Sequence, residues 1–288
     1  MPGTSARPRP FSSDNRSPSN VDWRIRFRRL RIAVLLLVLA GVGLSQWAFE
    51  RRIRTWLHPI RIVLIPISAE PDPAVDEYAE RLSKDIFEPV SRFLAREAER
   101  HGLGYPLEIT FSVAASRHDL PPLPPAEVGP VQAVLYSLKL RWWNLWVLGR
   151  ADLPPHDIRM ALVLHRATPN ATIDHSLGLM RGQIAIVHGL ADERFEGILR
   201  VVVAHELMHI AGAEDLYDSR GRPRYPAGYV NPALGRDQPQ SQAALMAGML
   251  PLGRGAFRLP TDLYETRIVE SSARKVGWLW NRAQSPPP

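Results

Sequence analysis

The 288-residue chain contains no cysteine. Disulfide bonds, thiol nucleophiles and zinc sites with cysteine ligands are therefore excluded. The absence leaves the compartment open, because a reducing cytosol and an exported domain without disulfides are both compatible with it. The hydrophobic share of 45% is ordinary for a globular protein, so the chain has enough apolar residues for one sizeable core.

The net positive charge of the chain is confined to its N-terminal part. Residues 1–61 contain 12 Lys+Arg and 3 Asp+Glu, a net charge of +9, whereas the other 227 residues contain 24 and 26, a net charge of −2. A nucleic-acid-binding domain normally carries its positive charge on the folded surface that contacts phosphate. The distribution argues against nucleic acid as a partner.

One long apolar run, Ile32 to Phe49, has 18 residues without a charge. As a helix it would be about 27 Å long, close to the thickness of a bilayer's hydrocarbon core. Five arginines precede it and three follow, which predicts an N-terminus inside and a domain on the periplasmic or extracytoplasmic side of the cytoplasmic membrane. A cleaved signal peptide and a buried core helix are the alternatives. The long preceding segment argues against the first and the flanking arginines against the second.

The chain therefore divides into four predicted parts. Residues 1–31 form a disordered basic tail, 32–49 a transmembrane helix, 50–60 a juxtamembrane linker and 61–288 the folded domain.

The folded domain alternates strand and helix patterns, which predicts an α/β (α+β) layer fold with one core. Tryptophans 142, 143 and 146 are assigned mainly to core packing, with a groove or a membrane contact as alternatives. We expect strands over 61–67, 107–114, 157–165 and 178–188, and helices over 73–100 (interrupted at Pro89), 131–148, 192–211 and 261–276.

The most informative segment is "VVVAHELMHIAGAEDLYD", residues 201–218. His205 and His209 are four residues apart on the predicted helix, so both imidazoles project from one face and can reach one Zn²⁺. Glu206 lies beside the pair, where it can take a proton from a water activated by zinc. The H-E-x-x-H pattern should arise by chance in roughly one such chain in a hundred.

A hydrogen-bonded pair of core histidines is the alternative to a metal site. It would bury Glu206 as well, and an unpaired buried carboxylate costs several kcal/mol or stays protonated. A metal opposite Glu206 removes this difficulty, so the sequence favours the metal site.

Gly212 and Asp215 follow the histidines at fixed offsets, and the full pattern is H-E-x-x-H-x-x-G-x-x-D. This resembles the metzincin clan of zinc peptidases, in the variant found in the snapalysin family, where aspartate replaces the third histidine. The resemblance covers roughly residues 178–250. It implies a zincin domain with a mixed sheet packed on the active-site helix.

Carried over by position, the resemblance implies His205, His209 and Asp215 as zinc ligands and Glu206 as general base. Gly212 would be the turn glycine, and Met246 the methionine of a tight turn beneath the metal, with Met249 as second choice. The strand that pairs with substrate corresponds to "RGQIAIVH", which implicates Gly182, Ile184 and Ala185. Glu214 and Asp218 remain alternatives to Asp215, because both lie close to it in the sequence.

The sequence therefore predicts a membrane-anchored zinc metalloendopeptidase that acts on a peptide or protein substrate. A non-catalytic, zinc-containing binding or assembly module is the main alternative. A zinc hydrolase acting on another kind of bond is the third, because nothing in the sequence specifies the scissile group.

Overall fold

The computed structural model describes residues 26–34, short pieces between residues 36 and 55, and then 55–123, 129–146, 149, 152–168 and 184–279. The chain divides into two compact units, Met1–Trp47 and Ala48–Pro288. In the first unit, residues 26–34 are helical. Among the described residues, no helix is long and apolar enough to cross a membrane. Much of the predicted 32–49 span, most of the predicted tail and Gly182 lie outside the described residues.

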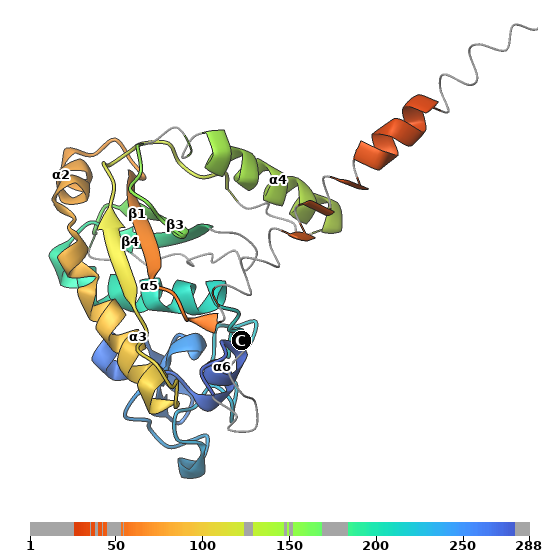
Figure 1. Ribbon diagram of the computed structural model, residues 1–288. Helices are drawn as coiled ribbons and strands as arrows, with labels where there is room; N and C mark the ends of the chain where they lie inside the picture. Colours follow the sequence, from red (N-terminus) through yellow and green to blue (C-terminus); the bar gives the residue numbers. More distant parts are fainter. Residues whose placement is uncertain are drawn as a thin grey trace, which may run out of the picture. The chain divides into compact units, whose positions relative to one another are not determined.

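The second unit contains the strands and helices of the folded domain (Figure 1). Its main elements are β1 (Ile60–Ser68), α2 (Pro73–Arg81), α3 (Glu88–Arg100), β2 (Ile109–Val113), α4 (Pro130–Trp146), β3 (Ile158–His165), β4 (Ile184–Leu190), α5 (Glu196–Ile210) and α6 (Glu270–Lys275). Short strands β5 (Ala243–Ala244), β6 (Leu250–Gly253), β7 (Ala256–Arg258) and β8 (Thr266–Arg267) follow α5. The order up to α5 agrees with the order expected from the sequence. The predicted helix 73–100 is divided into α2 and α3, and Pro89 lies in the first turn of α3.

The central sheet has the strand order β2-β1-β3-β4, and its three pairings are all parallel. The expected mixed sheet is therefore corrected to a parallel one for the four described strands of the central sheet. Parallel neighbours require crossover connections, and α2 with α3 joins β1 to β2 while α4 lies between β2 and β3. Such sheets are covered on both faces, which explains why β1 and β3 are apolar along nearly their whole length.

The helices cover the two faces of this sheet in a way that follows from the strand order. β2 and β3 lie on opposite sides of β1, and right-handed crossovers in opposite directions place their helices on opposite faces. The larger core joins one face of the sheet to α2, α3 and α5. The smaller core joins the other face to Leu140 and Trp143 of α4, and Figure 1 shows α4 across the sheet from α3 and α5.

The larger core extends into the segment predicted as a linker. Ile53 and Trp56 are 3% and 5% exposed and belong to this core. The indole N–H of Trp56 donates to the carbonyl of Val276 at 2.6 Å, and its ring contacts Trp278. The segment that enters β1 is therefore packed against the end of the domain.

The predicted helix over 261–276 is wrong in its first half. Arg258 and the backbone N–H of Thr261 hydrogen-bond to Glu265, and these hydrogen bonds lower the pKa of Glu265 to about 2. Thr266 and Arg267 then extend as β8 beside β5, so only Glu270–Lys275 is helical. The polar contacts hold the backbone in a turn and a strand, which overrides the local helical pattern.

A buried carboxylate fixes this C-terminal segment to α3. Glu97 is 4% exposed and accepts hydrogen bonds from Arg100, Arg267 and the backbone N–H of Ile268. Burial raises the pKa of Glu97, but the hydrogen bonds from Arg100, Ile268 and Arg267 outweigh burial and lower it overall. The contact joins residues 170 positions apart, so it ties α3 to the C-terminal segment.

Candidate metal centre and active site

The helix α5 carries the H-E-x-x-H motif and ends at the turn that the sequence predicts. It lies against the larger core and is apolar on nearly every side because the sheet and other segments cover it. Gly212 has φ 104°, its N–H donates to His209 O, and Ala213 N donates to Met208 O. This is the Schellman arrangement, in which a left-handed residue reverses the chain after a helix. The reversal directs the following residues back toward the two histidines.

Both imidazoles are oriented by backbone carbonyls. Nδ1 of His205 donates to Leu245 O at 3.0 Å, and Nδ1 of His209 donates to Ala213 O at 2.9 Å. A carbonyl oxygen only accepts, so each neutral ring carries its proton on Nδ1 and presents the lone pair of Nε2. Carbonyl partners of this kind fix the tautomer of histidines that bind metals.

The two Nε2 atoms converge on the carboxylate of Asp215. Oδ1 of Asp215 lies 3.4 Å from Nε2 of His205 and 3.0 Å from Nε2 of His209. With both histidines neutral, this buried oxygen has no hydrogen-bond donor among the described residues. Two nitrogen lone pairs and an anionic oxygen repel one another, and a cation bound between them would relieve this repulsion.

A metal ion fits this arrangement. His205, His209 and Asp215 could hold one, because their ligand atoms all lie within 4.8 Å of one another. Zinc ligands about 2.0–2.2 Å from the metal at tetrahedral angles are about 3.3–3.6 Å apart, so the His205–Asp215 separation of 3.4 Å fits directly and the His209–Asp215 separation of 3.0 Å is slightly shorter. Two imidazoles and one carboxylate also leave a fourth position for substrate or water.

Without a metal, a proton can take the place of the cation. Burial lowers the pKa of His209, but the hydrogen bond to Asp215 and the charge of that carboxylate outweigh burial and raise it. Burial likewise raises the pKa of Asp215, but hydrogen bonds from His205 and His209 outweigh burial and lower it well below its usual range. Proton and metal therefore compete for the same position, as is usual for histidine ligands.

Glu206 is the most buried charged residue of the site. It is 1% exposed, and its Oε2 has no hydrogen-bond partner among the described residues. Burial raises the pKa of Glu206, and the charge of Asp215 adds to this, while the two histidines oppose it. A carboxylate with a raised pKa and an oxygen without a hydrogen-bond partner among the described residues is suited to accept and release a proton.

The other two candidate ligands are engaged elsewhere. Oε1 of Glu214 accepts from the Lys275 ammonium at 2.6 Å, and Asp218 accepts from the backbone N–H groups of Arg220 and Arg222. Asp215 is thus the carboxylate that the structure brings to the two histidines.

A tight turn contacts the site through a hydrogen bond to His205. Leu245–Ala247 forms a 3₁₀ turn that ends at the left-handed Gly248, and its Leu245 carbonyl is the acceptor for His205. Met246 is 1% exposed in the larger core, and its carbonyl accepts from Leu216 N at 2.8 Å. Met249 instead lines the pocket beside the site. The special role of Met246 stays a prediction, although its turn does contact the site.

Tyr217 is a site residue that the sequence analysis missed. Burial, the charge of Asp215 and a hydrogen bond to that carboxylate together raise its pKa far above 10. Tyr217 also lines the pocket that contains His205 and Glu206. Its position two residues after Asp215 is the only sequence signal that could have indicated it.

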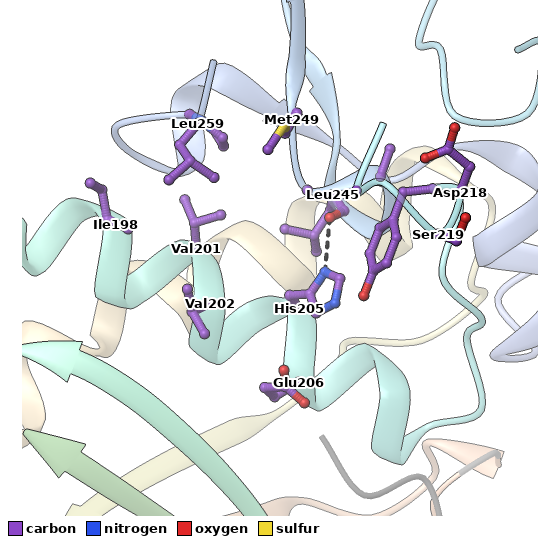
Figure 2. A pocket seen from close by; sticks show the side chains of 15 residues that line it. Ile198, Val201, Val202, His205, Glu206, Asp218, Ser219, Leu245, Met249 and Leu259 are labelled. Carbon is purple, nitrogen blue, oxygen red and sulfur yellow. Dashed lines mark hydrogen bonds between the residues drawn. The ribbon is translucent and has the colours of Figure 1, made fainter. Parts of the chain in front are cut away.

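A cavity of about 310 Å³ opens beside Glu206 and His205. Figure 2 shows Ile198, Val201 and Val202 following one another along α5 toward His205, and the dashed line marks its bond to Leu245. Apolar side chains form most of the wall, and Tyr217, Asp218 and Ser219 contribute polar groups. This volume and lining are typical of sites for small molecules or side chains.

The predicted substrate-binding strand is β4, at one edge of the described sheet. The side chains of Ile184 and Ala185 are buried in the two cores, and neither lines the cavity. A role for the strand's backbone in pairing with substrate stays a prediction. His188 of β4 hydrogen-bonds to His165 of β3 at 2.9 Å, so these two histidines contact each other.

Comparison with known proteins adds little to this description. No family model and no curated protein matches the chain. The crystal structure of wild-type OgpA from Akkermansia muciniphila is similar at a TM-score of 0.36 and 13% identity, covering 74% of this chain and 58% of that chain. Catalytically inactive OgpA in complex with an O-glycopeptide, glycodrosocin, gives a TM-score of 0.35 with the same identity and coverage. The chain thus spans less than two thirds of that protein, and a likeness of this size does not establish a shared activity.

Proposed function

We propose that the protein is a zinc-dependent peptidase with His205, His209 and Asp215 as metal ligands. The observation that carries the proposal is the convergence of two Nε2 lone pairs on the buried Oδ1 of Asp215, next to a Glu206 oxygen that has no hydrogen-bond partner in the part of the chain that the structure describes. The donor set of two imidazoles and one carboxylate suits zinc. A bound Zn²⁺ would polarise the scissile carbonyl and lower the pKa of a nearby water.

The residues around the metal position divide the remaining work. Glu206 accepts a proton from the attacking water and returns it to the leaving amine, as its raised pKa allows. The carbonyls of Leu245 and Ala213 hold the imidazoles in the tautomer that leaves Nε2 available. Tyr217 supports Asp215 through its hydroxyl. Unlike a purely structural zinc site, this arrangement includes a group that can move a proton.

The cavity indicates which substrates fit. Its wall is mainly apolar, formed by Ile198, Val201, Val202, Leu245, Met249 and Leu259 (Figure 2). Burial of a substrate side chain in this cavity would stabilise the complex by about 1.5–3 kcal/mol for Leu, Phe or Met. We therefore propose peptides with a large apolar residue next to the scissile bond as the substrate class.

We also propose that residues 32–49 anchor the chain in the cytoplasmic membrane, with the domain on the extracytoplasmic side. The 18-residue uncharged run and its arginine flanks support this topology. Protease added to intact cells after permeabilisation of the outer layer should digest the domain, and alkaline carbonate should leave the chain in the membrane. Full protection of the domain in right-side-out vesicles would contradict the topology.

The activity is tested with the purified full chain and a peptide library that varies the residues around the scissile bond. We expect stoichiometric zinc, cleavage next to large apolar residues, loss of cleavage with a chelator and recovery on adding zinc. Zinc binding without any cleavage would instead favour the alternative, a non-catalytic zinc-containing module. Cleavage that survives complete removal of the metal would contradict the proposal.

A further inference from the structure

The helix α4 has apolar side chains on two opposite faces. Leu140 and Trp143 are 4% and 5% exposed and pack on the sheet in the smaller core. A second set of large apolar residues on the same helix is between 52% and 66% exposed: Leu135, Leu138, Trp142, Leu145 and Trp146. Packing within the domain explains the first face but leaves the second in contact with solvent.

The exposed residues form one continuous stripe. Their spacing is 3, 4, 3 and 1 positions, which places all five within an arc of about 100° on a helix of 3.6 residues per turn. Scattered surface hydrophobes are ordinary, but five large ones on one face of one helix form a contiguous patch. Such a patch usually marks a surface that binds something apolar.

Two exposed cations border the stripe, one on each side. Lys139 and Arg141 lie about 70° and 90° from its centre by the same helical geometry. Residues 129–150 contain these two and Arg150 but no Asp or Glu. An apolar stripe with cations on both flanks is the pattern of a helix that lies in the interface of an anionic bilayer. Trp142 and Trp146 add the aromatic residues that concentrate at that depth.

We propose that α4 is a membrane-docking surface, whose exposed stripe enters the headgroup region of an anionic phospholipid bilayer. A second copy of the chain fits the face less well. In a symmetric contact the Lys139 and Arg141 side chains of both copies would meet without an acidic partner on the helix. Anionic lipid headgroups supply the opposite charge, and each Lys or Arg near such a surface contributes about 1 kcal/mol.

The length of the connecting segment supports this occupant. This step rests on the proposed anchor, whose last residue is Phe49. Ile53 is already part of the domain's core. Four residues extend at most about 14 Å, so an anchored domain would stay at the bilayer surface. Docking through α4 would then fix which face of the domain meets the lipid.

The absence of cysteine makes a direct test possible. We would introduce Leu138→Cys and Leu145→Cys singly into the full chain, label each with an environment-sensitive dye and reconstitute the chain in vesicles. Leu234→Cys and Leu252→Cys are matched controls, because these leucines are 48% and 44% exposed on other segments. In phosphatidylglycerol-containing vesicles, we expect spin-labelled lipid to quench the stripe dyes severalfold more than the control dyes. Combining Lys139→Glu with Arg141→Glu should reduce quenching to the level in pure phosphatidylcholine.

Each outcome bears on the proposal separately from the peptidase activity. Equal quenching at stripe and control positions would overturn it, even if the chain stays in the vesicles through its anchor. Shielding of the stripe dye that needs no lipid and grows with protein concentration would overturn it in favour of a second copy. None of the labelled positions lines the catalytic cavity. The labelled variants should therefore cleave a soluble peptide as the parent chain does, and this cleavage reports on the active site alone.

Discussion

Nε2 of His209 lies 3.0 Å from Oδ1 of Asp215, a residue placed beyond the end of α5 by the turn at Gly212. The separation is close to a hydrogen bond, yet the Nδ1 proton of His209 is already donated to Ala213 O. A second proton or a metal ion between the two atoms would relieve the repulsion between them. Four of the predictions below concern this pair and its surroundings, and the fifth concerns the buried carboxylate of Glu97.

His205→Ala, His209→Ala and Asp215→Ala should each remove most of the bound zinc, because each deletes one of three protein ligands. The loss of affinity should exceed the roughly 10- to 100-fold cost of removing a residue that only supports a ligand. Metal titration of the full chain is the measurement. Glu214→Ala is the matched control, since Glu214 pairs with Lys275 instead, and zinc loss there equal to that in Asp215→Ala would refute the ligand assignment.

Glu206→Gln should keep the zinc and lose the activity. Glutamine preserves the size of the side chain but cannot accept a proton, so cleavage should fall by about 10²- to 10⁴-fold. Zinc content and peptide cleavage are measured on the same preparation. Unchanged cleavage would exclude Glu206 as the base, and loss of zinc would make it a ligand.

Tyr217→Phe should lower metal affinity or cleavage by about 10- to 100-fold, because it removes a hydroxyl that supports Asp215. Tyr264→Phe is the control, since Tyr264 is 73% exposed and does not line the cavity. Zinc affinity and kcat are measured for both variants. If Tyr217→Phe behaves like the control in both measurements, Tyr217 has no part in the site.

Gly212→Ala should destabilise the domain by about 1–2 kcal/mol or more, because a side chain disfavours positive φ. It should also weaken zinc binding, since the turn positions both Ala213 O and Asp215. Gly104→Ala is the control: its φ is outside the left-handed range and its added Cβ meets open space. Thermal unfolding with and without zinc checks this prediction, and equal effects of the two substitutions would contradict it.

Glu97→Gln should lower stability at neutral pH by about 1.5–3 kcal/mol, the usual contribution of hydrogen bonds to a charged group. The folded-state pKa of Glu97 is lowered from 4.5, so its stabilisation is present above pH 4.5 and is lost as the pH falls toward the folded value. The difference between parent and variant should therefore shrink in acid. Chemical unfolding at several pH values is the measurement. Glu80→Gln is the control, because Glu80 is exposed. A stability difference that does not change with pH would contradict the expected pH dependence.

The sequence by itself determined the parts of this protein that depend on local spacing. The i, i+4 spacing of His205 and His209 fixes both imidazoles on one face of any helix, and Gly212 marks its end. The order of strands and helices up to α5 also followed from local periodicity, because each element has its own apolar pattern.

Tertiary structure decided the features that depend on distant segments. Which of the three carboxylates lies beside the histidines was visible only in the fold, where Glu214 pairs with Lys275 and Asp218 accepts from the loop backbone. The parallel strand order depends on non-local pairing, which local periodicity does not encode.

The acceptor for His205 lies 40 residues further along the chain, at Leu245. The helix α4 carries apolar residues on both faces, so only its packing on the sheet showed which of them stay exposed. These features depend on contacts between residues far apart in the sequence, and such contacts exist only once the chain has folded.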